Sequence, residues 1–242
     1  MFGFLVNIFD IFLYRPLFNF LVLIYNYLPT HDFGLTIILV TIIIRFILYP
    51  ISVKALNSQK VLQLLQPKIE EIQRKFKDDK EKQAKETLEL YRKEKINPFS
   101  GLFLIIIQLP ILIALYRVFW EGLKPEALNS LYNFVVNPIH INAMFFNVVN
   151  LSKPNFTFAV LAGIIQFFQT KMLAPKLNKK QAKEANMASI MQKQMLYIFP
   201  VITIIILLKL PSALGLYWIV SGIFSIIQQY FIFNKNKGAQ PT

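Results

Sequence analysis

The chain of 242 residues has no cysteine, little charge of either sign and only 13 acidic residues. The absence of cysteine excludes disulfide bonds, thiolate zinc sites, iron–sulfur clusters and cysteine nucleophiles. Charged residues make up 16% of the chain, whereas an ordinary soluble domain holds about 25%. Disorder is excluded as well, because 55% of the residues are hydrophobic and would collapse or insert into a membrane.

What charge there is has mostly one sign, since 26 Lys and Arg residues give a formal net charge of +13. A basic excess of this size usually indicates a nucleic-acid-binding protein. Such a protein would not carry 23 phenylalanines in long uncharged runs. A polytopic membrane protein with its positive charge in the loops satisfies both observations.

Five segments come close to the roughly 20 apolar residues that a spanning helix needs. They predict an all-α fold with a five-helix transmembrane core. The predicted spans are Phe33–Val53, Pro98–Trp120, Phe156–Ala174, Met195–Leu210 and Ser212–Phe233.

The N-terminal 30 residues are also apolar, but Asp10, Arg15 and Pro16 interrupt the run. No positive region and small-residue cleavage site of a signal peptide precede Arg15. We expect a helix lying in the membrane interface, and a sixth span is the alternative. Its buried face at helical spacing would consist of Phe18, Leu21, Tyr25 and Leu28.

The distribution of charge predicts the orientation, because basic residues collect in cytoplasmic loops. Twenty of the 26 basic residues lie in three stretches: Lys54–Lys95, Lys171–Lys193 and the C-terminal tail. With five spans, the N-terminus is expected outside and the C-terminus in the cytoplasm. The predicted organisation is a first span at 31–56, a cytoplasmic insert at 57–97, four spans within 98–233 and a tail at 234–242. The outer loop is 121–155 and the second cytoplasmic loop 171–194.

The insert 57–97 is predicted to be an antiparallel helical hairpin. Its first arm carries a seam at alternating three- and four-residue steps. Pro67 predicts a kink or a late start in that arm, and Asp78 with Glu81 suits a capping box that restarts the helix. The hairpin is either a solvated spacer or a docking element for the ribosome, a targeting factor or the nascent chain. The seam consists of Leu62, Leu65, Ile69, Ile72 and Phe76, and the facing residues are Ala84, Leu88 and Tyr91.

Arg45 is the charge that lies out of place, because the span around it contains no acid. In a straight helix it lies roughly 13 Å from Lys54 and about 18 Å from Phe33. An arginine at that depth costs about 2.5–3.5 kcal/mol on insertion scales and usually faces water or a partner.

Polar residues on the other spans offer that partner. In hydrocarbon an unpaired amide or hydroxyl is costly, so these faces are expected to meet one another or water. Each contact alone is best explained as a hydrogen bond that holds the bundle together. The set as a whole predicts a hydrated groove around Arg45. Its members are Thr41, Arg45 and Ser52; Gln108; Gln166, Gln169 and Thr170; and Trp218, Ser221, Ser225 and Gln229.

Other chemistry is sparse. His31 and His140 fall in predicted outer loops and are expected to be surface imidazoles. No nucleophile–base pair, metal-ligand cluster or Gly-rich phosphate loop is visible, so neither an enzyme nor a cofactor is expected. A proton-coupled transporter would need an intramembrane acid, and none is present.

Five motifs stand out along the chain: Thr41–Pro50, Leu65–Lys68, Leu90–Phe99, Ile107–Tyr116 and Pro211–Val220. Together they resemble the YidC/Oxa/Alb family of membrane protein insertases. They follow the family's order over about residues 30–233. The N-terminal part lacks the large periplasmic domain of some members and the lipoprotein cysteine of others.

The resemblance implies a multi-pass protein of the bacterial plasma membrane that inserts and helps fold nascent membrane proteins. It also implies a positively charged groove, open to cytoplasm and lipid, with Arg45 as its arginine and Thr41 as the partner one turn earlier. Gln166 then falls at a groove position, and Tyr217 and Trp218 fall where substrates touch the last span. Candidate partners are the nascent chain, the ribosome, signal recognition particle components, the Sec translocon and membrane lipids, but no specific nucleic acid. A small-solute transporter or channel and an accessory factor of a larger translocase are the alternatives.

Overall fold

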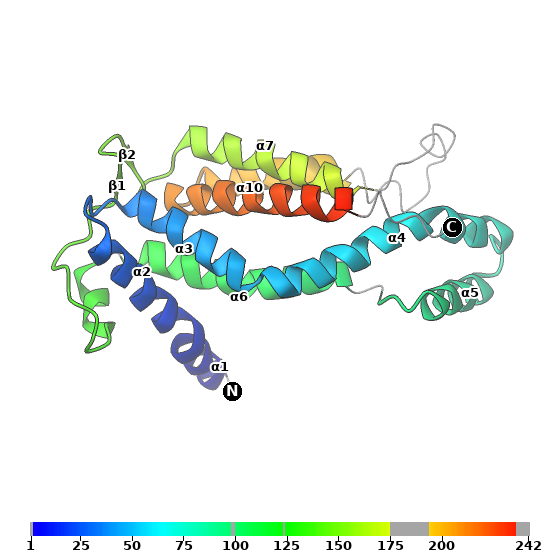
Figure 1. Cartoon of the computed structure of the whole chain (residues 1–242), viewed down its shortest axis with the longest axis horizontal. Helices are drawn as coiled ribbons and strands as arrows, with labels where there is room; N and C mark the ends of the chain where they lie inside the picture. Colours follow the sequence, from blue (N-terminus) through cyan, green and yellow to red (C-terminus); the bar gives the residue numbers. More distant parts are fainter. Residues whose placement is uncertain (1, 98–99, 123, 175–193, 236–242) are drawn as a thin grey trace.

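The structure, a computed structural model, describes residues 2–97, 100–122, 124–174 and 194–235 (Figure 1). Within them the fold is helical apart from one hairpin of two-residue strands, which confirms the all-α prediction. Most of the predicted loop 171–194 and of the tail 234–242 lies outside the described residues. The N-terminal elements are α1 (Phe2–Phe9), a π-helical turn (Asp10–Tyr14), α2 (Arg15–Tyr27), α3 (Phe33–Ile47), α4 (Tyr49–Lys75) and α5 (Lys80–Lys93). They are followed by α6 (Ser100–Trp120), a 3₁₀ turn (Pro125–Ser130), β1 (Met144–Phe145), β2 (Val149–Asn150), α7 (Phe156–Leu173), a second π-helical turn (Gln194–Ile198), α9 (Phe199–Leu207) and α10 (Ser212–Lys235).

Helix α10 is the centre of the bundle. It packs along α7 on one side and α3 on the other, while α9 packs on α7 and α6 lies against α4. Figure 1 shows the axes of α3, α6, α7 and α10 roughly parallel, with α6 running in the opposite chain direction to the other three. At Gly163 the α7 and α9 backbones approach closely, since an added Cβ would lie 3.2 Å from the Pro200 carbonyl oxygen. The core is therefore assembled from helices far apart in the chain.

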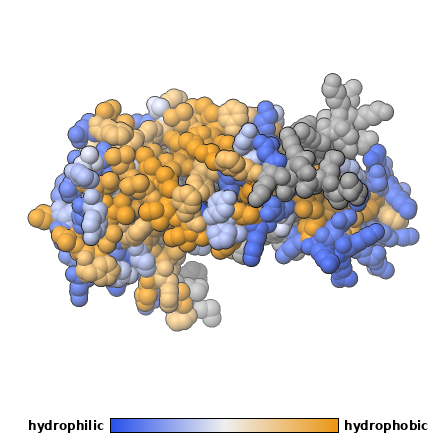
Figure 2. All heavy atoms as spheres, viewed as in Figure 1, coloured by the Kyte–Doolittle hydropathy of each residue, from blue (hydrophilic) through white to orange (hydrophobic). Residues whose placement is uncertain are grey.

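The apolar helices fit a membrane by length and composition. Val6–Tyr27, Phe156–Leu173 and Ser212–Asn234 are each long and apolar enough to cross, and α3 with α4 passes the same test as one bent pair. Gln108–Trp120 and Gln194–Leu207 are shorter apolar stretches. The predicted count of five core spans thus stays a prediction, as does the choice between an interfacial and a spanning N-terminal helix. Figure 2 shows a hydrophobic band over the middle of the molecule and a hydrophilic end at the α4–α5 hairpin.

The first predicted span, Phe33–Val53, is broken. Helix α3 ends at Ile47, and α4 leaves at an angle of 65° beyond Leu48. Pro50 lies in the first turn of α4, where its missing N–H suits the start of a helix rather than the interior. A straight helix from Phe33 to Lys54 is therefore wrong.

The helical hairpin is present, with three corrections. Pro67 lies inside a continuous α4, so the late start is wrong. The cap of α5 is Asp79, whose side chain accepts a hydrogen bond from the Lys82 amide at 2.9 Å, and not Asp78. Gln83 donates to the Gln73 carbonyl of α4, and this turns a neighbouring face of α5 toward α4. Ala84 and Leu88 are exposed, whereas the half-buried residues are Gln83, Glu86, Thr87, Leu90 and Tyr91.

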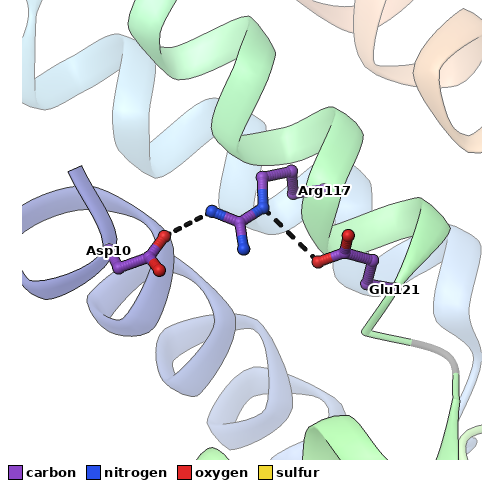
Figure 3. Close-up of polar contacts among 3 residues, drawn as sticks. All are labelled: Asp10, Arg117 and Glu121. Carbon is purple, nitrogen blue, oxygen red and sulfur yellow. Dashed lines mark hydrogen bonds and ion pairs between the residues drawn. The ribbon is translucent and has the colours of Figure 1, made fainter. Parts of the chain in front are cut away.

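The N-terminal helix is fixed to the core by an ion cluster. Arg117 of α6 pairs with Asp10 and with Glu121, and the Glu121 contact is 3.4 Å long (Figure 3). The guanidinium carbon also lies 4.5 Å from the centre of the Tyr14 ring. The π-helical turn at Asp10–Tyr14 supplies both the Asp10 carboxylate and the Tyr14 ring that contact this guanidinium. Three of the four residues predicted for the buried face are buried, namely Phe18, Leu21 and Tyr25, while Leu28 is half-buried.

Removal of this cluster should loosen the N-terminal helix. Arg117→Met keeps the length of the side chain but leaves Asp10 without its cation, so we expect a loss of about 1–2 kcal/mol, allowing for partial exposure. Arg15→Met is the matched control, because Arg15 is exposed and forms no ion pair among the described residues. Thermal unfolding in detergent measures the effect. Equal unfolding midpoints for the two variants would contradict a stabilising role of the cluster.

Candidate functional site

Arg45 lies in the last turn of α3, just before the bend at Leu48. The sequence alone indicates a position in mid-span, but the bend makes α3 only 15 residues long. Arg45 is consequently near one end of its helix, where a positive charge suits the negative end of the helix dipole. The side chain is half-buried.

Three helices meet at the guanidinium group. Arg45 Nη2 donates to Gln108 Oε1 of α6 at 3.4 Å and to Ser221 Oγ of α10. Gln108 in turn donates through Nε2 to the hydroxyl of Tyr217 on α10. The structure thus joins four of the predicted groove residues in one hydrogen-bonded network.

Every partner in that network is neutral. Among the described residues Arg45 forms no ion pair. Hydroxyl and amide oxygens can orient a guanidinium but do not cancel its charge. The site therefore presents a positive charge, held in place and left available to an anion.

The remaining predicted residues lie around this junction without joining it. Trp218 Nε1 donates to Gln166 Oε1 at 3.0 Å, which connects α10 to α7. Thr41 is buried and its hydroxyl donates to the Ile37 carbonyl of its own helix, at 2.6 Å. Gln169 is half-buried, within 3.8 Å of the position that a Cβ of Gly222 would occupy.

A second polar contact connects α10 to α4, and it was not predicted in full. Gln228 Nε2 donates to Ser52 Oγ at 2.7 Å, and Gln228 is buried. Gln228 lies seven residues after Ser221, so helical spacing from Ser221 was the signal for it. The neighbouring Gln229 is also buried, and its Oε1 has no partner among the described residues.

The two histidines are exposed, as the sequence predicts. Both line a cavity of about 610 Å³ at the end of α2. In the part of the chain that the structure describes, no group of three His, Cys, Asp or Glu residues is placed to hold a metal ion.

Residues 23–239 match the family model of the 60Kd inner membrane protein. The chain is 36% identical over 204 residues to a membrane protein insertase YidC of Fusobacterium nucleatum subsp. nucleatum, which covers 84% of this chain and 87% of that protein. A membrane protein insertase YidC of Wigglesworthia glossinidia brevipalpis is 31% identical over 226 residues, covering 93% of this chain but 37% of the relative. The chain thus spans most of the first relative and little more than a third of the second.

A solved structure is also similar. It is the crystal structure of an active YidC insertase in which the first transmembrane domain is resolved. The similarity has a TM-score of 0.58 and 29% sequence identity, and it covers 90% of this chain and 46% of that one.

The hydrogen bond from Gln108 to the Tyr217 hydroxyl is expected to stabilise the protein. In Tyr217→Phe the Gln108 amide loses its acceptor inside the bundle, which should cost about 1–2 kcal/mol. Tyr230→Phe removes a hydroxyl from an exposed tyrosine of the same helix and should change stability little. Thermal unfolding of both variants in one detergent compares them. A Tyr217→Phe protein as stable as Tyr230→Phe would show that the hydrogen bond contributes nothing.

Proposed function

The chain belongs to the 60Kd inner membrane protein family, the YidC membrane protein insertases, and on that premise we propose how it inserts its substrates. Arg45 attracts the polar or acidic end of a nascent membrane protein into a hydrated groove that is open to the cytoplasm. The apolar helix of the substrate then passes into lipid. No covalent bond is made or broken in this step.

The observation that carries this proposal is the unneutralised guanidinium of Arg45. An unpaired charge among apolar helices is costly, and a bundle built for stability alone would replace it with an apolar residue or pair it with a carboxylate. Here Gln108 and Ser221 hold it with neutral oxygens. This arrangement favours transient binding of an acidic substrate segment to Arg45 over a permanent ion pair within the protein.

The size of the attraction suits a transient step. A guanidinium and a carboxylate 4 Å apart attract each other by up to about 4 kcal/mol at an effective dielectric constant of 20, and by less where water screens them. The membrane potential moves an acidic segment outward with about 2.3 kcal/mol per charge per 100 mV. Together these terms offset part of the cost of carrying a short polar segment across.

The exposed sides of α7 and α10 suit the apolar part of the substrate. On α7 the exposed residues Leu161, Ile164 and Phe168 follow one another at steps of three and four, so they form one stripe. On α10 Ile223 and Ile227 are exposed in the same way. We propose that the substrate helix slides along these stripes, because its burial in lipid drives the step.

The α4–α5 hairpin is proposed as the docking element for the ribosome or a targeting factor. It lies at the hydrophilic end of the molecule and has exposed basic residues beside the exposed Leu64 and Leu88 (Figure 2). Its position together with the basic loops supports a cytoplasmic location, with the N-terminus outside and the C-terminus inside. A contact with the Sec translocon belongs to the same proposal.

Two alternatives differ from this proposal in what they require. A solute transporter or channel would open the Arg45 site to both membrane faces in turn. An accessory factor of a larger translocase would have no activity alone. The unpaired arginine favours the insertase, because an attraction for an acidic segment needs neither a through-pore nor a second protein.

Charge at position 45 should decide activity. With purified protein in liposomes and an acidic-tailed single-span substrate, Arg45→Ala should lower insertion at least about tenfold, which corresponds to 1.4 kcal/mol. Arg45→Glu should lower it further, and Arg45→Lys should retain most of the activity, because attraction needs charge rather than fork geometry.

Arg74→Ala is the matched control, since Arg74 is an exposed arginine on the hairpin. A substrate without acidic residues in its tail should respond less to every Arg45 variant. Normal insertion of the acidic substrate by both Arg45→Ala and Arg45→Glu would refute the electrostatic mechanism.

Orientation and access are testable with single cysteines, because the chain has none of its own. A membrane-impermeant maleimide added to intact cells should label Asn129→Cys and leave Lys85→Cys and Gln166→Cys unlabelled. Inverted vesicles should reverse the pattern. Labelling of Gln166→Cys from both sides would favour a transporter or channel instead.

A further inference from the structure

The loop 131–152, at the end of the bundle opposite the α4–α5 hairpin, carries no Asp, Glu, Lys or Arg in 22 residues (Figure 1). It buries Val135, Ile141 and Leu151, yet it leaves other large hydrophobic side chains exposed. Ile139 is 86% exposed and Val148 79% exposed. Phe134, Val136 and Phe146 are exposed as well, and Tyr27 at the end of α2 adds a sixth such side chain.

The backbone of the loop adopts strained conformations that keep these side chains outside. Ile139 has a φ of 62° and Phe146 a φ of 47°, both in the left-handed region that β-branched and bulky residues avoid. A loop under no constraint would place glycine or asparagine there. Strain of this kind persists only where surrounding contacts impose it.

Those contacts come from polar side chains of the N-terminal helix and the start of α3. Asn19 accepts from the Tyr132 amide at 2.6 Å, and the Tyr25 hydroxyl accepts from the Asn142 amide at 3.0 Å. Asn26 donates to the Val136 carbonyl at 2.6 Å. The loop is thereby attached to α2 along its length.

Asp32 adds a further attachment, in which each carboxylate oxygen accepts a hydrogen bond from a different backbone amide. Oδ1 accepts from the Leu35 amide at 2.8 Å and caps α3, while Oδ2 accepts from the Phe146 amide at 2.5 Å. Gly34 lets the β1 strand pack directly on α3, since an added Cβ would overlap the Phe145 ring. The exposed tip Phe146–Val148 is thus a rigid extension of α3.

Within the loop, asparagines satisfy further backbone amides. Asn137 accepts from the Ile139 amide at 2.8 Å, Asn142 from Met144 at 3.2 Å and Asn150 from Ser152 at 3.0 Å. Irregular backbone is tolerated near hydrocarbon only where the protein satisfies its polar groups. This loop satisfies many of them without charge and presents apolar side chains outward.

We propose that loop 131–152, together with Tyr27, is a lipid-binding surface that rests in the interfacial layer of the bilayer at the end opposite the hairpin. This surface continues the hydrophobic band of the molecule, because the exposed side chains of Trp120 and Phe156 lie at the adjacent ends of α6 and α7. The rim of a protein–protein interface is polar, whereas the large side chains that this loop exposes are apolar. The proposal needs only a chain embedded in a membrane, so it holds or fails independently of the insertase mechanism.

The test places an environment-sensitive dye on the tip. Ile139→Cys and, separately, Val148→Cys are labelled in purified protein and reconstituted at low density into phosphatidylcholine liposomes that contain this protein alone. Some of the lipid carries a nitroxide quencher near the headgroup. We expect blue-shifted emission at both positions, quenching by the nitroxide lipid and protection from iodide in the water.

Leu88→Cys is the matched control, because Leu88 is an exposed apolar residue of the hairpin, far from the proposed surface. Its dye should show the opposite pattern, quenched by iodide and not by the lipid. If the dye at 139 or at 148 behaves like the dye at 88, the proposal is overturned, and a face that binds another protein would give that result. Thermal unfolding midpoints close to those of the parent protein show that each labelled variant is folded.

Discussion

The positive charge of Arg45, held between three helices without a counter-ion, is the interaction on which the bundle depends. Its guanidinium connects α3 to Gln108 of α6 and Ser221 of α10, and Gln108 extends the network to Tyr217. The same contacts that fix the charge also fix the relative positions of the helices. In the proposed mechanism stability and function compete at one point, because a carboxylate that neutralised Arg45 would remove the charge proposed to attract the substrate.

Much of this arrangement is predictable from the sequence. Apolar runs gave the helices, and the helical spacing of Thr41 and Arg45, or of Trp218, Ser221 and Ser225, gave the polar faces. Arg45 is identifiable by its isolation in an apolar span, since no acid lies within it. Four of the predicted groove residues meet in one network. The role of these residues in substrate binding is still a prediction, as is the number of spans.

What escaped prediction depends on contacts between distant parts of the chain. The 65° bend at Leu48 changes the depth of Arg45, and spacing along a straight helix cannot show it. The face of α5 is set by Gln83 on the Gln73 carbonyl, a contact that no periodicity indicates. Asp10 interrupts an apolar run, and its ion-pair partner, Arg117, lies more than a hundred residues later in the chain. Asn19 and Asp32 likewise look like ordinary polar residues until the loop that they hold is in place.

The double attachment of Asp32 has a mechanical consequence. Because α3 is one rigid helix, Arg45 is held at a set distance of about 20 Å from the residue that caps the helix and grips the loop tip. If that tip rests in the interfacial layer, as proposed, the length of α3 sets the depth of Arg45 relative to that leaflet. In a thinner bilayer the same helix brings Arg45 closer to the water at the opposite face, and in a thicker one it leaves the charge deeper. Because the helix has a fixed length, the thickness of the bilayer would then change the depth of the Arg45 charge.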